Sequence, residues 1–159
     1  MDLIKIVYLP NYDLEQWGEI EQIGGNACFD LRAAILKPVT VYSYYEKMKL
    51  GLNPIVKIPM GIIVELPCNM SLQVYPRSGM GSKGQILVHS PGVIDPSYRG
   101  EVVAHMINFG NKDFEIKPGD RILQAELQEV RRVVFKTIDE GQLSDTWRGE
   151  NGFGHSGTR

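Results

Sequence analysis

The sequence has few cysteines and no long block of basic residues. Among its 159 residues there are only two cysteines, Cys28 and Cys68. Two are too few for a disulfide scaffold or for a zinc site built from cysteines. The net charge is -2, and no basic run is longer than Arg131-Arg132. We therefore expect no nucleic-acid partner of the kind that depends on many phosphate contacts.

Long apolar runs and metal-binding clusters are also missing. No stretch approaches the ~18 apolar residues of a membrane helix, and the N-terminus lacks the basic and apolar regions of a signal peptide. We expect a cytoplasmic protein with reduced thiols and no membrane contact. The three histidines, His89, His105 and His155, lie far apart, and no His, Cys and carboxylate cluster has metal-ligand spacing.

What the sequence does contain is many short runs of β-branched and aromatic residues, with Pro and Gly turns about every ten residues. The apolar fraction of 43% and the charged fraction of 23% are ordinary for one domain with a core. No long helices alternate with these runs, so the pattern predicts an all-β sandwich or barrel with one short helix inside residues 12–20. The expected strands cover residues 3–9, 27–34, 39–45, 54–58, 61–66, 70–75, 102–108, 121–127 and 133–138.

The C-terminal stretch 147–159 differs from the rest. It holds four glycines and almost no aliphatic residues, so it buries too little surface to order itself. A frayed terminus is one interpretation. The other is a tail that closes over a ligand, because Phe153 offers stacking area and Arg148 can pair with phosphate. We expect a domain over 1–147 and a flexible tail over 148–159.

A turn-rich segment near the middle of the chain, residues 90–102, carries candidate chemistry. Gly92, Pro96 and Gly100 punctuate it between two apolar runs, which predicts a β-hairpin. Asp95 lies near its tip, together with Tyr98. A carboxylate there is either an ordinary turn residue or a general base held beside a small planar ligand.

Five segments, in this order and spacing, resemble the motifs of the trimeric dUTP pyrophosphatase (dUTPase) family: 27–33, 76–84, 91–101, 119–124 and 148–157. The second and third are the most specific, and the resemblance extends from residue 3 to the C-terminus. It implies a jelly-roll-like β-barrel, a homotrimer with sites between subunits, and a tail of one subunit closing over the site of another. The implied reaction is hydrolysis of dUTP to dUMP and pyrophosphate, which keeps uracil out of DNA.

By this resemblance, the hairpin would bind the uracil and the deoxyribose and would activate the attacking water. Asp95 would deprotonate the water that attacks the α-phosphate. Tyr98 would pack on the deoxyribose and exclude a 2′-hydroxyl, which selects against UTP. Main-chain groups at Gly92, Val93 and Ile94 would read uracil.

The other motifs would hold the phosphates. The residues implied to bind substrate there are Arg77, Ser78, Gly79, Gln124, Arg148, Phe153, Gly154 and Ser156, with Phe153 stacking on uracil. Asp30 would be a supporting carboxylate close to the site, although a solvent-facing strand Asp fits the sequence nearly as well. The implied cofactor is Mg²⁺, held by triphosphate oxygens and water rather than by protein side chains.

Two other functions compete with this one. A dCTP deaminase of the same fold shares the Ile94-Asp95-Pro96 hairpin, but needs a Glu at the place that His105 occupies here. A β-barrel module that binds a nucleotide or a protein without turnover is the second, and an intact Asp95 argues against it. Asn151, His155 and His89 depart from the residues usual in the family.

Overall fold

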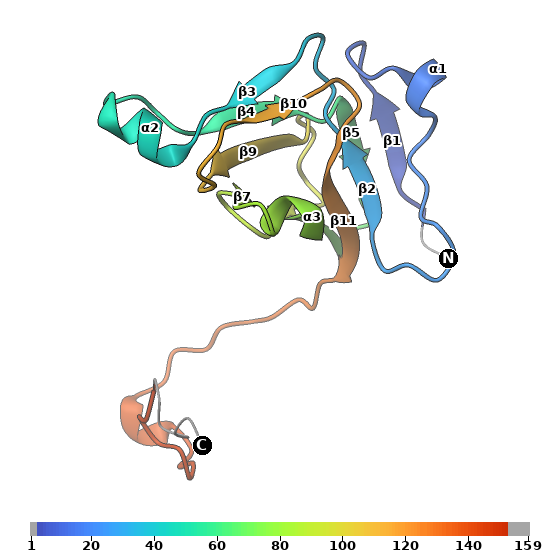
Figure 1. Ribbon diagram of the computed structural model, residues 1–159. Coiled ribbons are helices and arrows are strands. Elements are labelled where there is room, and N and C mark those ends of the chain that lie inside the picture. Colours follow the sequence, from blue (N-terminus) through green and yellow to red (C-terminus); the bar gives the residue numbers. More distant parts are fainter. Residues whose placement is uncertain (1–2, 153–159) are drawn as a thin grey trace.

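The computed structural model describes residues 3–152, which form a β-barrel and a long C-terminal extension (Figure 1). The strands are β1 Lys5–Tyr8, β2 Phe29–Arg32, β3 Val39–Val41, β4 Val56–Pro59, β5 Ile62–Glu65, β6 Met70–Pro76, β7 Gln85–Leu87, β8 Gly92–Ile94, β9 Val103–Asn108, β10 Phe114–Ile116 and β11 Arg121–Glu129. The helices are short: α1 Leu14–Trp17, α2 Tyr44–Lys49, α3 Ser78–Gly81 and the 3-10 turn η1 Glu140–Gln142. The predicted all-β class is confirmed.

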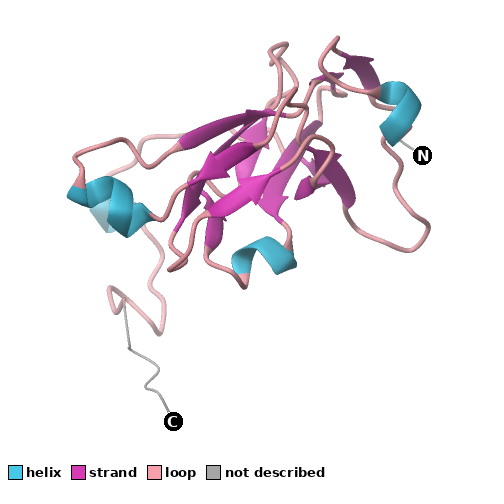
Figure 2. Ribbon diagram, turned by 45° about the horizontal axis from the view of Figure 1, so that its top comes forward, coloured by secondary structure: helices cyan, strands magenta, loops and turns pink. Residues whose placement is uncertain are grey.

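The strands pair antiparallel in four small sheets, which Figure 2 shows wrapped around a common centre. The largest has the order β2-β11-β6-β8, and a second has the order β4-β9-β7. The pairs β1-β5 and β10-β3 complete the set. Strands that are distant in sequence are therefore neighbours, as in β2 and β11, which brings residue 30 opposite residue 124.

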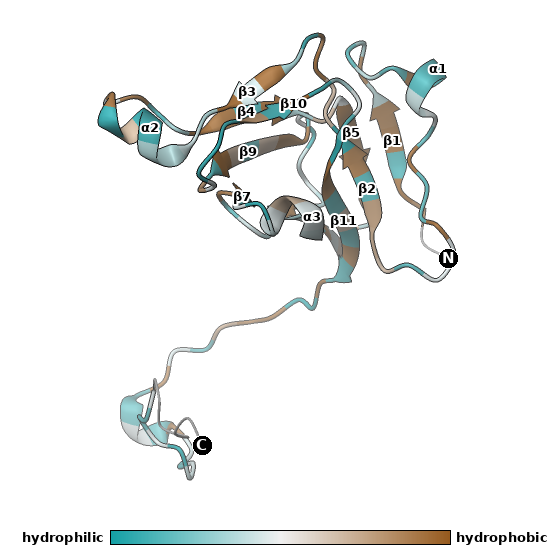
Figure 3. Ribbon diagram, viewed as in Figure 1, coloured by the Kyte–Doolittle hydropathy of each residue, from teal (hydrophilic) through white to brown (hydrophobic). Residues whose placement is uncertain are grey.

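The core lies where these sheets face one another. Alternation along the strands puts one face inward: on β5 the side chains of Ile62 and Val64 are buried, whereas Ile63 is half-buried and Glu65 is exposed. Figure 3 shows hydrophobic residues concentrated in the strands of the barrel. Fully buried side chains include Leu31, Ile58, Met60, Leu72, Leu87, Met106, Ile116, Ile122 and Leu123.

Some predicted elements differ from the observed ones. The β-rich run at 39–45 is a strand only over Val39–Val41, and α2 begins at Tyr44. Ser43, between them, keeps a single bridge to Asn108 of β9, while its N–H and hydroxyl donate to the Asp113 carboxylate and the Gly110 carbonyl. β10 at Phe114–Ile116 was not predicted. The predicted strand at 133–138 is wrong: these residues are extended but pair with no strand in residues 3–152.

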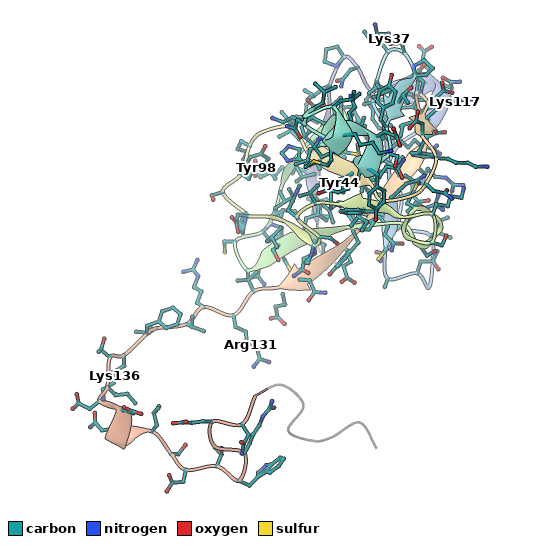
Figure 4. The ribbon with its side chains drawn as sticks, turned by 60° about the vertical axis from the view of Figure 1, so that its left-hand side comes forward. Lys37, Tyr44, Tyr98, Lys117, Arg131 and Lys136 are labelled. Atoms are coloured by element: carbon teal, nitrogen blue, oxygen red, sulfur yellow. The ribbon has the colours of Figure 1, made fainter. Side chains whose placement is uncertain are left out.

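Beyond β11 the chain leaves the barrel. Residues 130–152 are all exposed, and Figure 1 shows them running away from the sheets. Val134 and Phe135 are 96% and 93% exposed, although both are apolar. Figure 4 shows Arg131 and Lys136 on the extension, beyond the strands of the barrel. The predicted division into 1–147 and 148–159 stays a prediction.

Candidate active site in two halves

Strand β6 joins the two groups of predicted site residues. Its C-terminal end leads through Pro76 into Arg77 and α3, and it pairs with β11 along most of its length. On its other side it pairs with β8, where Ile94 is opposite Leu72. Five residues separate Leu72 from Arg77, so at ~3.3 Å per residue the two ends lie roughly 17 Å apart.

The first half is a cleft of about 1010 Å³ at the Arg77 end of β6. The predicted residues Asp30, Arg77, Ser78, Gly79 and Gln124 all line it. Its remaining walls are Tyr12, Trp17, Glu19, Ile20, Glu21, Ile23, Asn26, Ala27, Cys28, Phe29, Arg32, Met80, Lys83 and Arg121. Three of the five motifs therefore meet in one concave surface of a single chain.

Asp30 is the centre of a charge network in this cleft. Its Oδ1 forms an ion pair with Arg77 Nε at 2.9 Å, and its Oδ2 accepts a hydrogen bond from Arg121 Nη1 at 3.1 Å. Arg77 Nη1 in turn donates to the Arg121 carbonyl at 3.2 Å. These contacts favour the interpretation of Asp30 as a supporting carboxylate over that of an isolated strand residue, because the carboxylate orients two guanidinium groups toward the same space.

Gln124 lies between the two motifs that neighbour it in the sheet. Its Cα partners are Asp30 on β2 and Tyr75 on β6, and its Nε2 donates to the Pro76 carbonyl at 3.4 Å. The side chain is half-buried. Gln124 is therefore held beside Arg77. No hydrogen bond within residues 3–152 uses its amide oxygen, which can therefore accept one from a ligand.

The cleft is suited to an anion. Ser78 and Gly79 open α3, where Arg77 is the N-cap residue and Met80 anchors the turn in the core. The cations Arg32 and Lys83 line the same cleft but were not identified in the sequence. Arg32 could have been found from the alternation that puts it on the face of β2 that carries Asp30. Lys83 had no such signal, because it follows a turn.

The Cys28 thiol in this cleft is not a nucleophile. Burial raises its pKa, and the nearby carboxylates of Glu126 and Asp30 raise it further. The thiol therefore stays protonated at neutral pH, and a protonated thiol attacks poorly.

The N-terminal segment, whose role the sequence did not reveal, supports this half. The Trp17 ring packs on Gly119, where a Cβ would stand 2.5 Å from Nε1, and also meets Tyr12 edge-to-face at 5.1 Å. Gly119 has φ +80, and its carbonyl accepts from Arg32 Nη1 at 2.9 Å. A side chain at this position would displace the ring and strain the turn.

The second half is the turn that follows β8. Asp95 is exposed, and its carbonyl accepts from the Tyr98 N–H at 3.0 Å. The Tyr98 hydroxyl donates to the Glu101 carbonyl at 3.0 Å, with its ring over Gly100. A Cβ on Gly100 would lie 2.3 Å from the Tyr98 oxygen, so only glycine lets the ring adopt this position. Tyr98 is visible at the edge of the barrel in Figure 4.

Glu101 anchors the C-terminal end of that turn to the barrel. Its Oε1 accepts from the Gly61 N–H at 2.9 Å and from Asn11 Nδ2 at 3.2 Å. The Asp95 carboxylate makes no hydrogen bond or ion pair in residues 3–152, which leaves it available to a water molecule. Gly92, Val93 and Ile94 form β8 itself, with Gly92 buried and Val93 exposed.

The tail contributes one described site residue. Arg148 Nε donates to the Asn151 carbonyl at 2.8 Å, and Nη2 donates to the Gly152 carbonyl at 3.4 Å. Phe153, Gly154 and Ser156 lie outside the described residues. Within residues 3–152 no group of three or more His, Cys, Asp or Glu side chains could hold a metal ion, and no helix there is long and apolar enough to cross a membrane.

Comparison with known proteins gives one family. The family model described as dUTPase matches residues 22–157. A deoxyuridine 5'-triphosphate nucleotidohydrolase of Orientia tsutsugamushi is 39% identical over 85% of this chain and 84% of its own. One of Chlamydia pneumoniae is 38% identical over 91% of this chain and 95% of its own.

Solved structures share the fold at lower identity. The dUTPase of Staphylococcus bacteriophage 80alpha, solved with dUPNHPP, superposes with a TM-score of 0.80 at 20% identity and covers 99% of both chains. The native EIAV dUTPase superposes with a TM-score of 0.66 at 18% identity, over 89% of this chain and all of its own. The dUTPase-type fold is thereby confirmed. The matched residues include all five motifs, and the chain belongs to the dUTPase family.

Proposed function

We propose that this protein hydrolyses dUTP to dUMP and pyrophosphate by attack of water on the α-phosphate. The observation that carries the proposal is the cleft in which Asp30 holds the guanidinium groups of Arg77 and Arg121, in a chain of the dUTPase family. Such a cleft is suited to a ligand with several phosphates, because forked guanidinium donors and the N–H groups that open α3 converge on it.

Asp95 acts as the general base. It takes a proton from water as the water oxygen bonds to the α-phosphorus, and the bond to the bridging oxygen breaks so that pyrophosphate leaves with the electron pair. The exposed carboxylate after β8 has room for that water. The hydrogen bond to the Glu101 carbonyl fixes the position of Tyr98. The fixed ring packs on the deoxyribose and leaves no space for a 2′-hydroxyl.

Arg77, Ser78 and Gln124 orient the phosphates. The two guanidinium groups held by Asp30 neutralise charge on the phosphate oxygens, and their fixed positions avoid reorganisation during the reaction. Mg²⁺, when bound to the triphosphate, adds charge neutralisation and fixes phosphate geometry. A related dUTPase from phage phi11 of S. aureus coordinates a structural Mg(II) ion, and here the ligands would be phosphate oxygens and water.

The active assembly is a homotrimer with its sites between subunits. Asp95 and Arg77 lie at opposite ends of β6, too far apart to act on one phosphate chain within a subunit. Val134 and Phe135 are apolar and fully exposed in the extension, which is costly unless another subunit covers them. A threefold arrangement lets the extension of one subunit reach a neighbour, where Arg148 meets phosphate, Phe153 stacks on uracil, and Gly154 and Ser156 hold the terminal phosphate.

We also place the protein in the cytoplasm, where both free thiols stay reduced. The test of the function is the release of pyrophosphate from dUTP, UTP, dTTP and dCTP. dUTP should be cleaved far faster than the other three. Comparable kcat/KM for UTP would remove the role given to Tyr98, ammonia release from dCTP would establish a deaminase instead, and binding without turnover would establish a binding module.

A further inference from the structure

Two histidines from different parts of the chain meet beside β8, outside the residues assigned above. His89 lies in the loop before β8, and His105 lies on β9. Their rings contact edge-to-face with centroids 5.2 Å apart. Neither histidine has been given a role in the reaction.

His89 also packs directly on the strand proposed to read uracil. Its Nε2 and Cδ2 lie 3.2 and 3.3 Å from the point where a Cβ would stand on Gly92. Gly92 is buried, and the absence of a side chain is what lets the imidazole come so close. Any displacement of the His89 ring therefore changes the packing that holds Gly92 and strand β8 in position.

The surroundings of His105 favour its uncharged form. Lys57 on β4 is the Cα partner of His105, and Val88 donates its N–H to the His105 carbonyl at 2.9 Å. Lys57 and His89 are the charged or titratable groups that act on His105. In residues 3–152 neither imidazole forms an ion pair with a carboxylate, so no opposite charge of the barrel pairs with a protonated ring, although His89 is exposed to solvent and His105 is half-buried.

We propose that the contact between the rings of His89 and His105 holds β8 in its base-reading position, so that affinity for the deoxyuridine group falls when His105 takes up a proton. This inference rests on the proposed function, because it assumes that β8 reads uracil. Both histidines are positioning residues, since they act through Gly92 rather than on the reacting atoms.

The direction of the effect follows from the charges. Burial lowers the pKa of His105 from its ordinary value, and His89 and Lys57 lower it further. When the surroundings of a base lower its pKa, protonation of that base weakens its packing against those surroundings. The pair is therefore stable above the ordinary imidazole pKa of about 6.5, and its support for β8 is lost as the pH falls from there through the lowered pKa of His105.

The first experiment uses the protein without nucleotide. Imidazole signals of the wild-type protein and of His89→Asn are followed by NMR between pH 5 and 8. Because His89→Asn removes a neighbouring ring and its charge, the midpoint of His105 should move to higher pH. An unchanged midpoint would show that the rings do not act as a pair and would overturn the inference.

The second experiment measures binding of deoxyuridine, which carries no titrating phosphate, at pH 7.5 and pH 5.5. The wild-type affinity should fall at least about threefold at the lower pH, whereas His105→Gln should lose most of this dependence. Lys37→Gln, an exposed lysine on the loop between β2 and β3, is the control that should behave as wild type. A wild-type affinity that is equal at both pH values would overturn the inference.

The hydrolysis assay separates this inference from the proposed function. If the inference is right, acid pH raises KM for dUTP in the wild type more than in His105→Gln, while the loss of kcat that comes from protonating the general base is the same in both. Hydrolysis of dUTP with identical KM profiles for the two proteins would overturn the role of the pair and leave the function intact. Failure to hydrolyse dUTP at every pH would overturn the function itself.

Discussion

The Arg77 end and the Asp95 end of β6 are built in different ways. At the Arg77 end, Asp30 on β2 and Arg121 on β11 meet Arg77, the N-cap of α3, and ion pairs join the three residues. At the Asp95 end the hydrogen bonds within the turn connect residues 95–101 with one another. The first is therefore a prepared anion cleft, whereas the second is a local turn that presents an unpartnered carboxylate outward. The difference supports the proposal that the cleft of one subunit meets the turn of another.

The largest effect should come from Asp95→Asn. An amide keeps the shape of the carboxylate but cannot take the proton from water, so kcat should fall by at least ~10²-fold. Affinity for dUTP should change little, because Asp95 contacts the water rather than the nucleotide. Steady-state pyrophosphate release and calorimetric binding would measure both quantities.

Ser97→Ala is the matched control in the same turn, since Ser97 is exposed and has no role assigned in binding or in the reaction. It should keep wild-type kcat. Near-normal turnover of Asp95→Asn would remove Asp95 from the role of base.

The second prediction tests whether the two halves of each active site lie on different subunits. Asp95→Asn and Arg77→Ala should each be almost inactive, but a mixture that is unfolded and refolded together should regain activity. If each site takes Asp95 from one subunit and Arg77 from another, random 1:1 mixing leaves ½ × ½, or about a quarter, of the sites intact.

Light scattering should report a threefold assembly for each variant and for the mixture. A mixture no more active than its parts, or a fully active monomer, would show that one chain holds the complete site.

A third effect concerns the extension that the barrel does not cover. A chain cut after Trp147 loses no core residue, so its melting temperature should stay close to that of the full chain. It loses Arg148 and Phe153, and base stacking on an aromatic ring alone is worth ~1–3 kcal/mol. At 1.4 kcal/mol per tenfold, kcat/KM should fall by at least about tenfold.

Phe153→Ala should give a smaller loss of the same kind. Full activity of the truncated chain would show that the tail does not close over the site, and unfolding would show that it belongs to the domain.

The smallest effect should come from Asp30→Asn. It removes the ion pairs to Arg77 and Arg121, which are partly exposed and so worth about 0.2–1 kcal/mol each. We expect KM for dUTP to rise roughly two- to tenfold, with a smaller change in kcat.

Glu46→Gln is the control, because it breaks the Lys49 pair at 2.8 Å on α2, which belongs to neither half of the site, and it should leave KM unchanged. An unchanged KM in Asp30→Asn would mean that Arg77 needs no partner to stay in position.

Local pattern predicted much of the barrel, and its failures have physical causes. Alternation identified the strands that became β6, β9 and β11, because their inward side chains are apolar. It failed at 133–138, where β-branched residues suit a strand but no neighbouring strand exists in the described chain to pair with them. It also extended β3 too far, because Tyr42 and Tyr44 suit a strand as well as a helix.

The sequence by itself determined the family, since the five motifs keep their order and spacing, and the resemblance of those motifs predicted roles for Asp95, Arg77 and Gln124. The tertiary structure decided what no local pattern could reach. Antiparallel pairing of β2 with β11 brought Asp30 to Arg77 and Arg121, and the packing of the loop before β8 brought His89 to His105 and Gly92. The reason is that a motif fixes chemistry over a few neighbouring residues, whereas contacts between residues up to 91 positions apart depend on sheet register, which only the folded chain establishes.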